Sequence, residues 1–382
     1  MLLRLPDELL QSIATYLTSE RDINAYCQTS RRTYNLLITH LYQYNAQHSN
    51  SYALFWAAEH NSAPTARNSV LVGASAQHAN LNRETPLLVA SSHGSDAVVK
   101  VLLAADGVDV NLRGAFGRTP LIVAASCGFD AVVDMLLTRR DIDLRARDQV
   151  GTSPIALAAR NGHERVVTVL LAKDGVDADS RDVWGATPLL EASQNGHTGV
   201  VALLLESGRV NPNGYDESAT PLGAAAARGY AKIVELLLAA TGVQPDNNKA
   251  AGRTPLFQAA ENGHENVVAL LLARRDVTPD VTDSHGVTPL SAAAEHGQLA
   301  VVKLLLAKSD VDPESRDNYG DTPLIVASRS GHEEVVKVLL ADGRADPSAV
   351  DSDGLAAASV AAQAGHEGVM MLLLASNGVG LD

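Results

Sequence analysis

The chain contains 382 residues, and its 30 Lys and Arg against 44 Asp and Glu give a formal net charge of −14. Such a charge argues against binding to a nucleic-acid backbone, which needs clustered basic side chains. Hydrophobic residues make up 46% of the chain but aromatic residues only 4%. Ala, Leu and Val must therefore build the core, which favours thin, stacked helices over one large globular core.

Targeting and redox signals are few. Cys27 and Cys127 lie far apart in the sequence, so a disulfide framework is excluded and a reducing compartment is indicated. The N-terminal segment MLLRLPDELL is interrupted by charged residues and lacks the apolar core of a signal peptide. No apolar segment approaches the roughly 18 residues of a membrane span. We therefore expect an intracellular protein of the cytoplasm or nucleus, without membrane association.

Residues 1–50 form the first predicted domain. Their acidic and basic residues cancel, so the whole net charge lies in residues 51–382. Apolar residues at helical spacing from Leu5 onward predict a first helix, and two further short helices are expected from Asp22 and from about Ser30. Three short helices make a core that is marginal on its own. We expect this domain to gain stability from a partner or from packing on the rest of the chain.

A sequence repeat fills residues 51–382. Its most regular mark is the proline of a Thr-Pro-Leu-like core, which recurs every 34 residues with one step of 33. These prolines are Pro86, Pro120, Pro154, Pro188, Pro221, Pro255, Pro289 and Pro323. A further copy has Ala357 in the proline position, and a degenerate copy around Leu54 precedes the others. We expect about ten units, which start near residues 52, 84, 118, 152, 186, 219, 253, 287, 321 and 355.

Each unit carries the signals of a helix pair. In the copy GDTPLIVASRSGHEEVVKVLL, Thr322 is a natural N-cap and Pro323 fits the first helical position. Gly331 can adopt the left-handed conformation that ends a helix, and EEVVKVLLA has the apolar spacing of a second helix. The Asp-, Gly- and Pro-rich segment that follows predicts a turn or hairpin, here called a finger. One such pair cannot cover its apolar face, but neighbours stacked on both sides can.

This pattern resembles the ankyrin repeat, which has a period of about 33 residues and a T-P-L-H-x-A signature. The resemblance covers roughly residues 52–378, although the usual His after Pro-Leu is replaced in every copy and the unit is one residue longer. The resemblance implies an all-α fold: an ankyrin-repeat solenoid of helix-turn-helix units with hairpin or turn fingers.

Histidines that follow a glycine recur in the units, at His163, His197, His264, His332 and His366. Stacked helices lie about 8–10 Å apart, whereas zinc ligands converge within about 2 Å of one ion. We therefore expect these histidines to order the turn between helices. Phosphate-binding glycine loops and a complete calcium loop are missing, and no local base accompanies Cys127. The sequence predicts no enzyme activity, no metal and no cofactor.

In ankyrin arrays, ligands usually contact the finger tips and the outer residues at the end of the first helix. The resemblance therefore implies a protein-binding face on the concave side of the array. The tip position, just before the finger glycine, holds Phe116, Trp184, His285 and Tyr319. Exposed tips should be polar, so the aromatic Phe116, Trp184 and Tyr319 are candidate anchors of a binding surface. The variable residues at the end of the first helix are Arg160, Gln194, Arg228, Glu261, His296 and Arg329. These ten residues are the predicted partner-binding set, although repeats also drift wherever packing does not constrain them.

The order Leu-Pro-x-Glu-Leu-Leu, then Asp-Ile and Ser-Arg-Arg, resembles an F-box over about residues 2–45. That family docks on a Skp-type adaptor of a cullin-based ubiquitin ligase, while another domain captures the substrate. By position, the docking residues would be Leu5, Pro6, Glu8, Leu9, Ile13, Leu17 and Ile23. Asn24 and Tyr26 depart from the motif, because Leu is commoner at their positions.

The sequence thus predicts a monomeric interaction adaptor. The array would hold a protein substrate, and residues 2–45 would recruit a Skp–cullin–F-box ubiquitin ligase. The alternatives are a plain ankyrin scaffold, in which residues 1–50 only cap the end of the array, and an accessory protein that positions a partner enzyme.

Overall fold

The computed structural model describes residues 25, 31–48, 51–215, 219–247 and 251–376. Within these ranges the protein contains 21 α-helices, one short 3-10 helix and no strand. An isolated antiparallel bridge joins Val350 and Ala356 at the base of one finger. No helix in this described part is both long and apolar enough to span a bilayer.

The chain forms two compact units, Met1–Ser180 and Arg181–Asp382. In the first unit, a leading helix precedes four helix pairs and a 3-10 turn. These elements are α3 (Arg31–His48), α4 (Tyr52–His60), α5 (Ala63–Leu71), α6 (Pro86–Ser92), α7 (Asp96–Leu103), η2 (Ala115–Gly117), α8 (Pro120–Cys127), α9 (Asp130–Leu136), α10 (Pro154–Arg160) and α11 (Glu164–Leu171).

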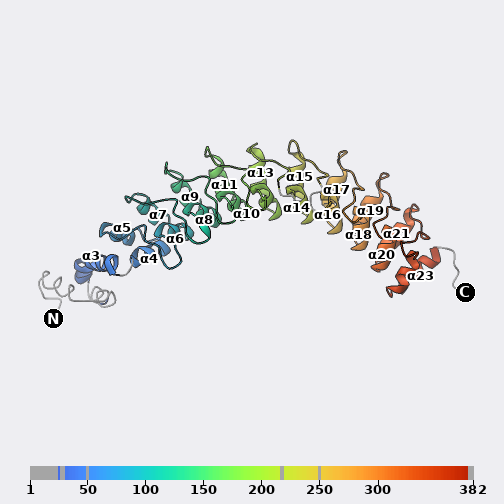
Figure 1. The fold of residues 1–382 in the computed structure, drawn as a ribbon, viewed down its shortest axis with the longest axis horizontal. Helices are drawn as coiled ribbons and strands as arrows, with labels where there is room; N and C mark the ends of the chain where they lie inside the picture. The colour runs from blue at the N-terminus through green and yellow to red at the C-terminus, as the bar shows by residue number, and fades with distance from the viewer. Residues whose placement is uncertain (1–24, 26–30, 49–50, 216–218, 248–250, 377–382) are drawn as a thin grey trace. The chain divides into compact units, whose positions relative to one another are not determined.

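The second unit consists of six helix pairs. They are α12 (Pro188–Gln194) with α13 (Thr198–Glu206), α14 (Pro221–Ala227) with α15 (Ala231–Ala239), α16 (Pro255–Glu261) with α17 (Glu265–Leu272), α18 (Pro289–Glu295) with α19 (Leu299–Leu306), α20 (Pro323–Arg329) with α21 (Glu333–Asp342), and α22 (Ala357–Gln363) with α23 (Glu367–Ser376). Within this unit each first helix packs against the next first helix, and each second helix packs against the next second helix. The two kinds of helix therefore form separate layers, as α14, α16 and α18 against α15, α17 and α19 show in Figure 1.

The expected helix signals act as predicted. Thr322 caps α20, because its side-chain oxygen accepts a hydrogen bond from the Ile325 amide, and Pro323 is the first helical residue. The same arrangement of a Thr or Ser cap followed by Pro starts the eight first helices from α6 to α20. Gly331 adopts a φ of +76° just after α20, where a residue with a Cβ atom would be strained. Pro and Gly thus fix both ends of these eight short first helices.

The recurring histidines order the contact between neighbouring pairs rather than only the turn within their own pair. The Nε2 atom of His264 lies 3.0 Å from the carbonyl oxygen of Ala227, in the preceding pair, and its ring packs on Gly229. His332 makes the same bond to the carbonyl of Glu295, at 2.8 Å. A Cβ atom on Gly229 would lie 2.6 Å from the His264 ring, so this glycine is needed for the close approach of the two pairs.

The N-terminal region differs in part from expectation. The third helix predicted there is an 18-residue helix, α3, and it packs against α4 and α5. The buried side chain of Asn45 accepts a hydrogen bond from the Ala53 amide at 2.8 Å. The other two predicted helices lie outside the described residues, and the domain boundary expected near residue 50 stays a prediction.

Candidate functional site

The finger tips are held in place by a recurring aspartate. In the finger before α18, the Oδ1 atom of Asp283 accepts hydrogen bonds from the amides of His285, at 2.8 Å, and Val287, at 3.1 Å. Asp317 binds the amides of Tyr319 and Asp321 in the same way. Because one carboxylate holds two amides on either side of the tip, the tip residue has a fixed backbone from which its side chain projects.

Backbone hydrogen bonds join neighbouring fingers in the later part of the second unit. The Ser284 amide donates to the carbonyl of Ala251, the Asn318 amide to that of His285, and the Ser352 amide to that of Tyr319, at 2.9–3.1 Å. The tips of the four fingers from Ala251 to Ser352 therefore form a continuous row. We call this row, together with the residues at the ends of the first helices, the finger face.

The three predicted tip aromatics are exposed. The side chain of Phe116, in the first unit, is 69% exposed, and those of Trp184 and Tyr319, in the second unit, are each 65% exposed. Large aromatic side chains on a rigid backbone are typical anchors of protein interfaces. Their use in binding stays a prediction.

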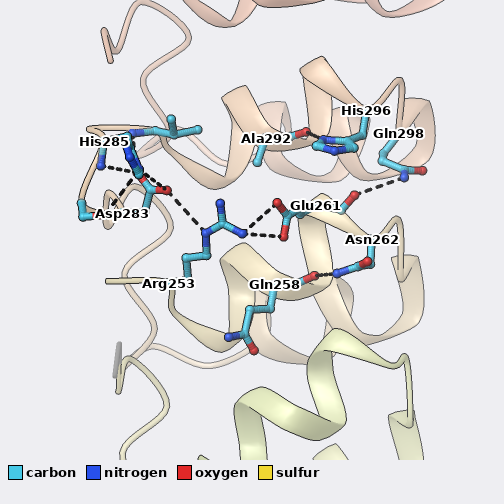
Figure 2. Close-up of polar contacts among 11 residues, drawn as sticks. Arg253, Gln258, Glu261, Asn262, Asp283, His285, Ala292, His296 and Gln298 are labelled. Carbon is cyan, nitrogen blue, oxygen red and sulfur yellow. Dashed lines mark hydrogen bonds and ion pairs between the residues drawn. The ribbon is translucent and has the colours of Figure 1, made fainter. Parts of the chain in front are cut away.

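The six residues expected at the ends of the first helices do not form one row. Arg160, Gln194, Glu261 and Arg329 are the last helical residues, whereas Arg228 and His296 follow their helices as C-caps. One helical residue corresponds to a rotation of about 100°, so the two positions point in different directions. His296 folds back onto its own helix, where its Nδ1 atom lies 2.9 Å from the carbonyl of Ala292 (Figure 2). His296 is therefore a helix-capping residue.

A polar hollow of about 280 Å³ lies on the finger face, between the pairs that start with α16, α18 and α20. On its α16 side, Arg253 Nη1 donates to both carboxylate oxygens of Glu261, at 3.0 and 3.1 Å. Arg253 Nε also lies 3.5 Å from Asp283 Oδ2, and His285 Nδ1 lies 3.7 Å from the same oxygen. Figure 2 shows these four side chains converging from α16 and from the neighbouring finger.

The opposite side of the hollow repeats this arrangement with the charges exchanged. Arg329 at the end of α20 pairs with Asp321, which stands where Arg253 stands two units earlier. Its Nη2 atom also lies 3.7 Å from Asp351 of the next finger. The hydrogen bond to Asp321, the largest cause, raises the pKa of Arg329 above its usual value. Two Arg–carboxylate pairs therefore bound the hollow. In one the arginine precedes the first helix and the carboxylate ends it, and in the other these two positions are exchanged.

The hollow brings together four of the predicted partner-binding residues: Glu261, His285, Tyr319 and Arg329. In the same unit, Trp184, Gln194, Arg228 and His296 do not line it. Phe116 and Arg160 belong to the first unit.

Sequence reasoning missed Arg253, Asp283 and Asp321. Their signal is present in the sequence: the residue two before the unit's proline and the residue eight positions later carry opposite charges in the units of Pro255 and Pro323. The aspartate of the finger also recurs two residues before several tips, as Asp148, Asp182, Asp283 and Asp317, but Gly114 stands there before Phe116.

The hollow offers charged and aromatic side chains that can form ion pairs, hydrogen bonds and apolar contacts with a partner. Across the part of the chain that the structure describes, no three His, Cys, Asp or Glu side chains are placed to hold a metal ion. Burial, the largest cause, raises the pKa of the Cys127 thiol, and nearby Arg118 lowers it to a smaller extent. A raised pKa disfavours the reactive thiolate at neutral pH.

Comparison with known families agrees with this architecture. The family model that describes three copies of the ankyrin repeat matches overlapping segments of the chain. These are residues 25–114, 54–148, 107–182, 155–248, 222–317, 266–351 and 306–382. The chain therefore belongs to the ankyrin-repeat family, whose repeats mediate protein–protein binding. No curated protein matches the sequence. The family comparison gives no F-box match, and the ankyrin match begins at residue 25, inside the segment that resembles an F-box.

Proposed function

We propose that this protein is an interaction adaptor that binds a partner protein through the finger face of its second unit. The observation that carries the proposal is the hollow between α16 and α20, where the exposed Tyr319 ring stands beside two Arg–carboxylate pairs. An aromatic anchor next to charged groups of both signs gives a partner one apolar contact and several directional polar ones.

The positions of these groups suit recognition because the partner need not order them. Asp317 fixes the Tyr319 backbone, and the Ser352 amide bonds to its carbonyl at 2.9 Å. Arg253 and Arg329 are already held by carboxylates. Since these side chains are fixed before binding, less conformational entropy is lost when a partner docks.

The proposal is tested with Tyr319→Ala and His285→Ala, because both side chains are exposed while the backbone groups that order the fingers stay unchanged. The matched control is Lys303→Ala, an exposed residue of α19 in the other helix layer. Proteins bound by the intact chain are quantified by affinity capture and mass spectrometry. We expect at least one partner to bind about thirtyfold more weakly to the tip variants, the effect of losing an anchor worth about 2 kcal/mol. Partners that bind all three variants equally would contradict the proposal.

We further propose that the array is the substrate receptor of a Skp–cullin–F-box ubiquitin ligase. This step rests on the resemblance of residues 2–45 to an F-box, and its docking residues Leu5, Pro6, Glu8, Leu9, Ile13, Leu17 and Ile23 lie outside the described residues. The packing of α3 on α4 and α5 favours the alternative, in which the N-terminal region caps a plain scaffold. Reconstitution with a Skp-type adaptor distinguishes the two functions. We expect Leu5→Asp with Leu9→Asp to abolish a complex that the unaltered chain forms; no complex, or an unchanged one, would favour the scaffold.

A further inference from the structure

The second-helix layer contains a recurring contact that we call the arm. It is an Arg or Lys side chain just after a second helix, and it donates to a carbonyl at the end of the preceding second helix. Arg274, after α17, donates from Nη1 to the carbonyl of Leu238 at 2.7 Å. Lys308, after α19, donates from Nζ to the carbonyl of Leu272 at 2.7 Å.

Two more residues act as arms in the same way. Arg139 in the first unit bonds to the carbonyl of Leu103 at 3.1 Å, and Arg344 in the second bonds to that of Leu306 at 2.7 Å. Each arm supplies positive charge at a helix C-terminus, where the helix dipole favours it.

The arm is missing after α15. Arg274 and Lys308 each stand three residues after a buried leucine, Leu271 or Leu305, and the corresponding position after Leu237 is Ala240. Thr241, Gly242 and Val243 follow, and none of these side chains can serve as a cationic arm. The end of α13 therefore lacks the charge that the ends of α15, α17 and α19 receive.

A hollow of about 440 Å³ lies where this arm would run. We call it the α13–α15 hollow. It is lined by Leu205, Glu206, Leu236, Ala239, Ala240 and Thr241, together with the finger base that follows α13. That finger belongs to the unit with the single 33-residue step. The missing side chain and the shorter loop together leave this space between two packed helices.

The groups around the hollow suit a cation with an apolar stem. The carbonyl of Leu205 accepts hydrogen bonds from amides of the chain that follows α13, including that of Gly208 at 3.1 Å, but no Arg or Lys side chain of the described residues donates to it. Glu206, at the end of α13, makes no ion pair with any described residue. Leu205 and Leu236 offer apolar surface along which the methylene groups of a long side chain can pack.

From this geometry we propose that the α13–α15 hollow binds an arginine side chain of a partner protein, in place of the missing arm. Three of these four arms are arginines. Arg274 shows the binding mode, because it bonds to the Leu238 carbonyl with one nitrogen and to Asp276 with two others. At the hollow, the Leu205 carbonyl corresponds to the Leu238 carbonyl. Glu206 offers a carboxylate in the role of Asp276, but from the end of α13 rather than from the loop that carries the arm. This site lies in the second-helix layer and is independent of the finger face.

The test uses acetyl-arginine methylamide as the probe and acetyl-citrulline methylamide, its neutral isostere, as the matched ligand. Titrations follow the methyl NMR signals of the intact chain. We expect saturable shifts at Leu205 and Leu236 with the arginine probe. The citrulline probe should bind at least about tenfold more weakly, because the charge-assisted hydrogen bonds are lost. Equal binding of acetyl-citrulline methylamide or of acetyl-leucine methylamide would show a general apolar hollow and overturn the proposal.

Two variants distinguish this hollow from other surfaces. Ala240→Lys supplies the arm from within the chain, as Lys308 does, and should abolish the shifts at Leu205 while raising the melting temperature. Arg274→Ala removes an arm and should create a second binding site, with new shifts at Leu238. A probe that binds the Ala240→Lys variant as well as the unaltered chain would overturn the proposal, whatever the effect of Arg274→Ala.

Discussion

At the scale of single residues, the side chain at the position of Asn213 joins the base of one finger to the base of the next, and an amide side chain suits this position best. Asn213 uses both ends of its side chain: Oδ1 accepts from the Gln244 amide at 2.7 Å, and Nδ2 donates to the carbonyl of Gly242 at 2.8 Å. Asp280 holds the corresponding position, and its Oδ2 accepts from the Asp312 amide at 2.6 Å. Its Oδ1 is buried without a hydrogen-bond partner among the described residues. An aspartate here lacks the donor that an asparagine provides.

The pKa of Asp280 reflects this environment. Burial, the largest cause, raises it above the usual value and outweighs the hydrogen bond from the Asp312 amide, which lowers it; the nearby charges of Asp312 and Asp310 add to the rise. A raised pKa in the folded state means that the protonated carboxyl is favoured by folding. Its stabilising contribution is present at acid pH and is lost as the pH rises through the folded-state pKa.

Asp280→Asn should therefore stabilise the protein at neutral pH by about 1 kcal/mol, the usual net value of one hydrogen bond. The gain should shrink as the pH falls below the pKa of Asp280, because the protonated aspartate can then donate as the amide does. Urea unfolding of both proteins across this pH range measures the difference. Asn213→Asp is the matched control and should lose stability at neutral pH. A gain that does not change with pH would contradict this account.

At the scale of the element, the start of each first helix shows how local capping supports the repeat. The first helices from α6 to α20 begin after a Thr or Ser whose side chain accepts from the backbone, but α22 begins after Ala356, which has no such bond. Ala357 also replaces the proline found at the first position of the others. The last helix pair thus lacks both local signals and relies on packing against α20.

Ala356→Thr should restore the cap. The backbone at this position, with φ −80° and ψ 161°, is close to that of the capping Thr322, at −87° and 163°. We expect a gain of about 1 kcal/mol in the local stability of α22. Amide hydrogen exchange over α22 and α23 measures it, and Thr322→Ala should have the opposite effect on α20. Unchanged exchange in α22 would mean that packing alone determines this helix.

At the scale of the whole molecule, stability is built from contacts between neighbours. Within the second unit, α17 packs against α15 and α19 in its layer and against its own partner α16. Bonds such as that from His264 to the Ala227 carbonyl also reach only the adjacent pair. A protein joined in this way responds to damage locally, and the effect fades with distance along the chain.

Leu271→Ala tests this property. The side chain is fully buried in α17, so its truncation should cost about 2–5 kcal/mol. Hydrogen exchange should accelerate most in α16 and α17, less in the pairs on either side, and little in α22 and α23. Uniform acceleration over the second unit would instead indicate a single cooperative core.

Much of this architecture follows from local sequence. The Thr-Pro cap, the glycine after each first helix and the 34-residue period predicted the helix pairs, because each feature acts over a few residues. The exposed tips Phe116, Trp184 and Tyr319 followed from the same register. The end of the first helix was less predictable, since Glu261 and His296 differ by one helical position and by the direction of their side chains.

What the sequence alone determined was the repeating unit, because caps, turns and apolar spacing are short-range effects that each copy specifies for itself. Only the tertiary structure decided which side chains from different units meet. Arg253, which pairs with Glu261 in its own unit, also reaches Asp283 of the next finger, and Arg274 reaches the end of α15 where Ala240 cannot reach the end of α13. Such contacts depend on stacking residues that lie about 34 positions apart in the chain, and no single unit contains the information for them.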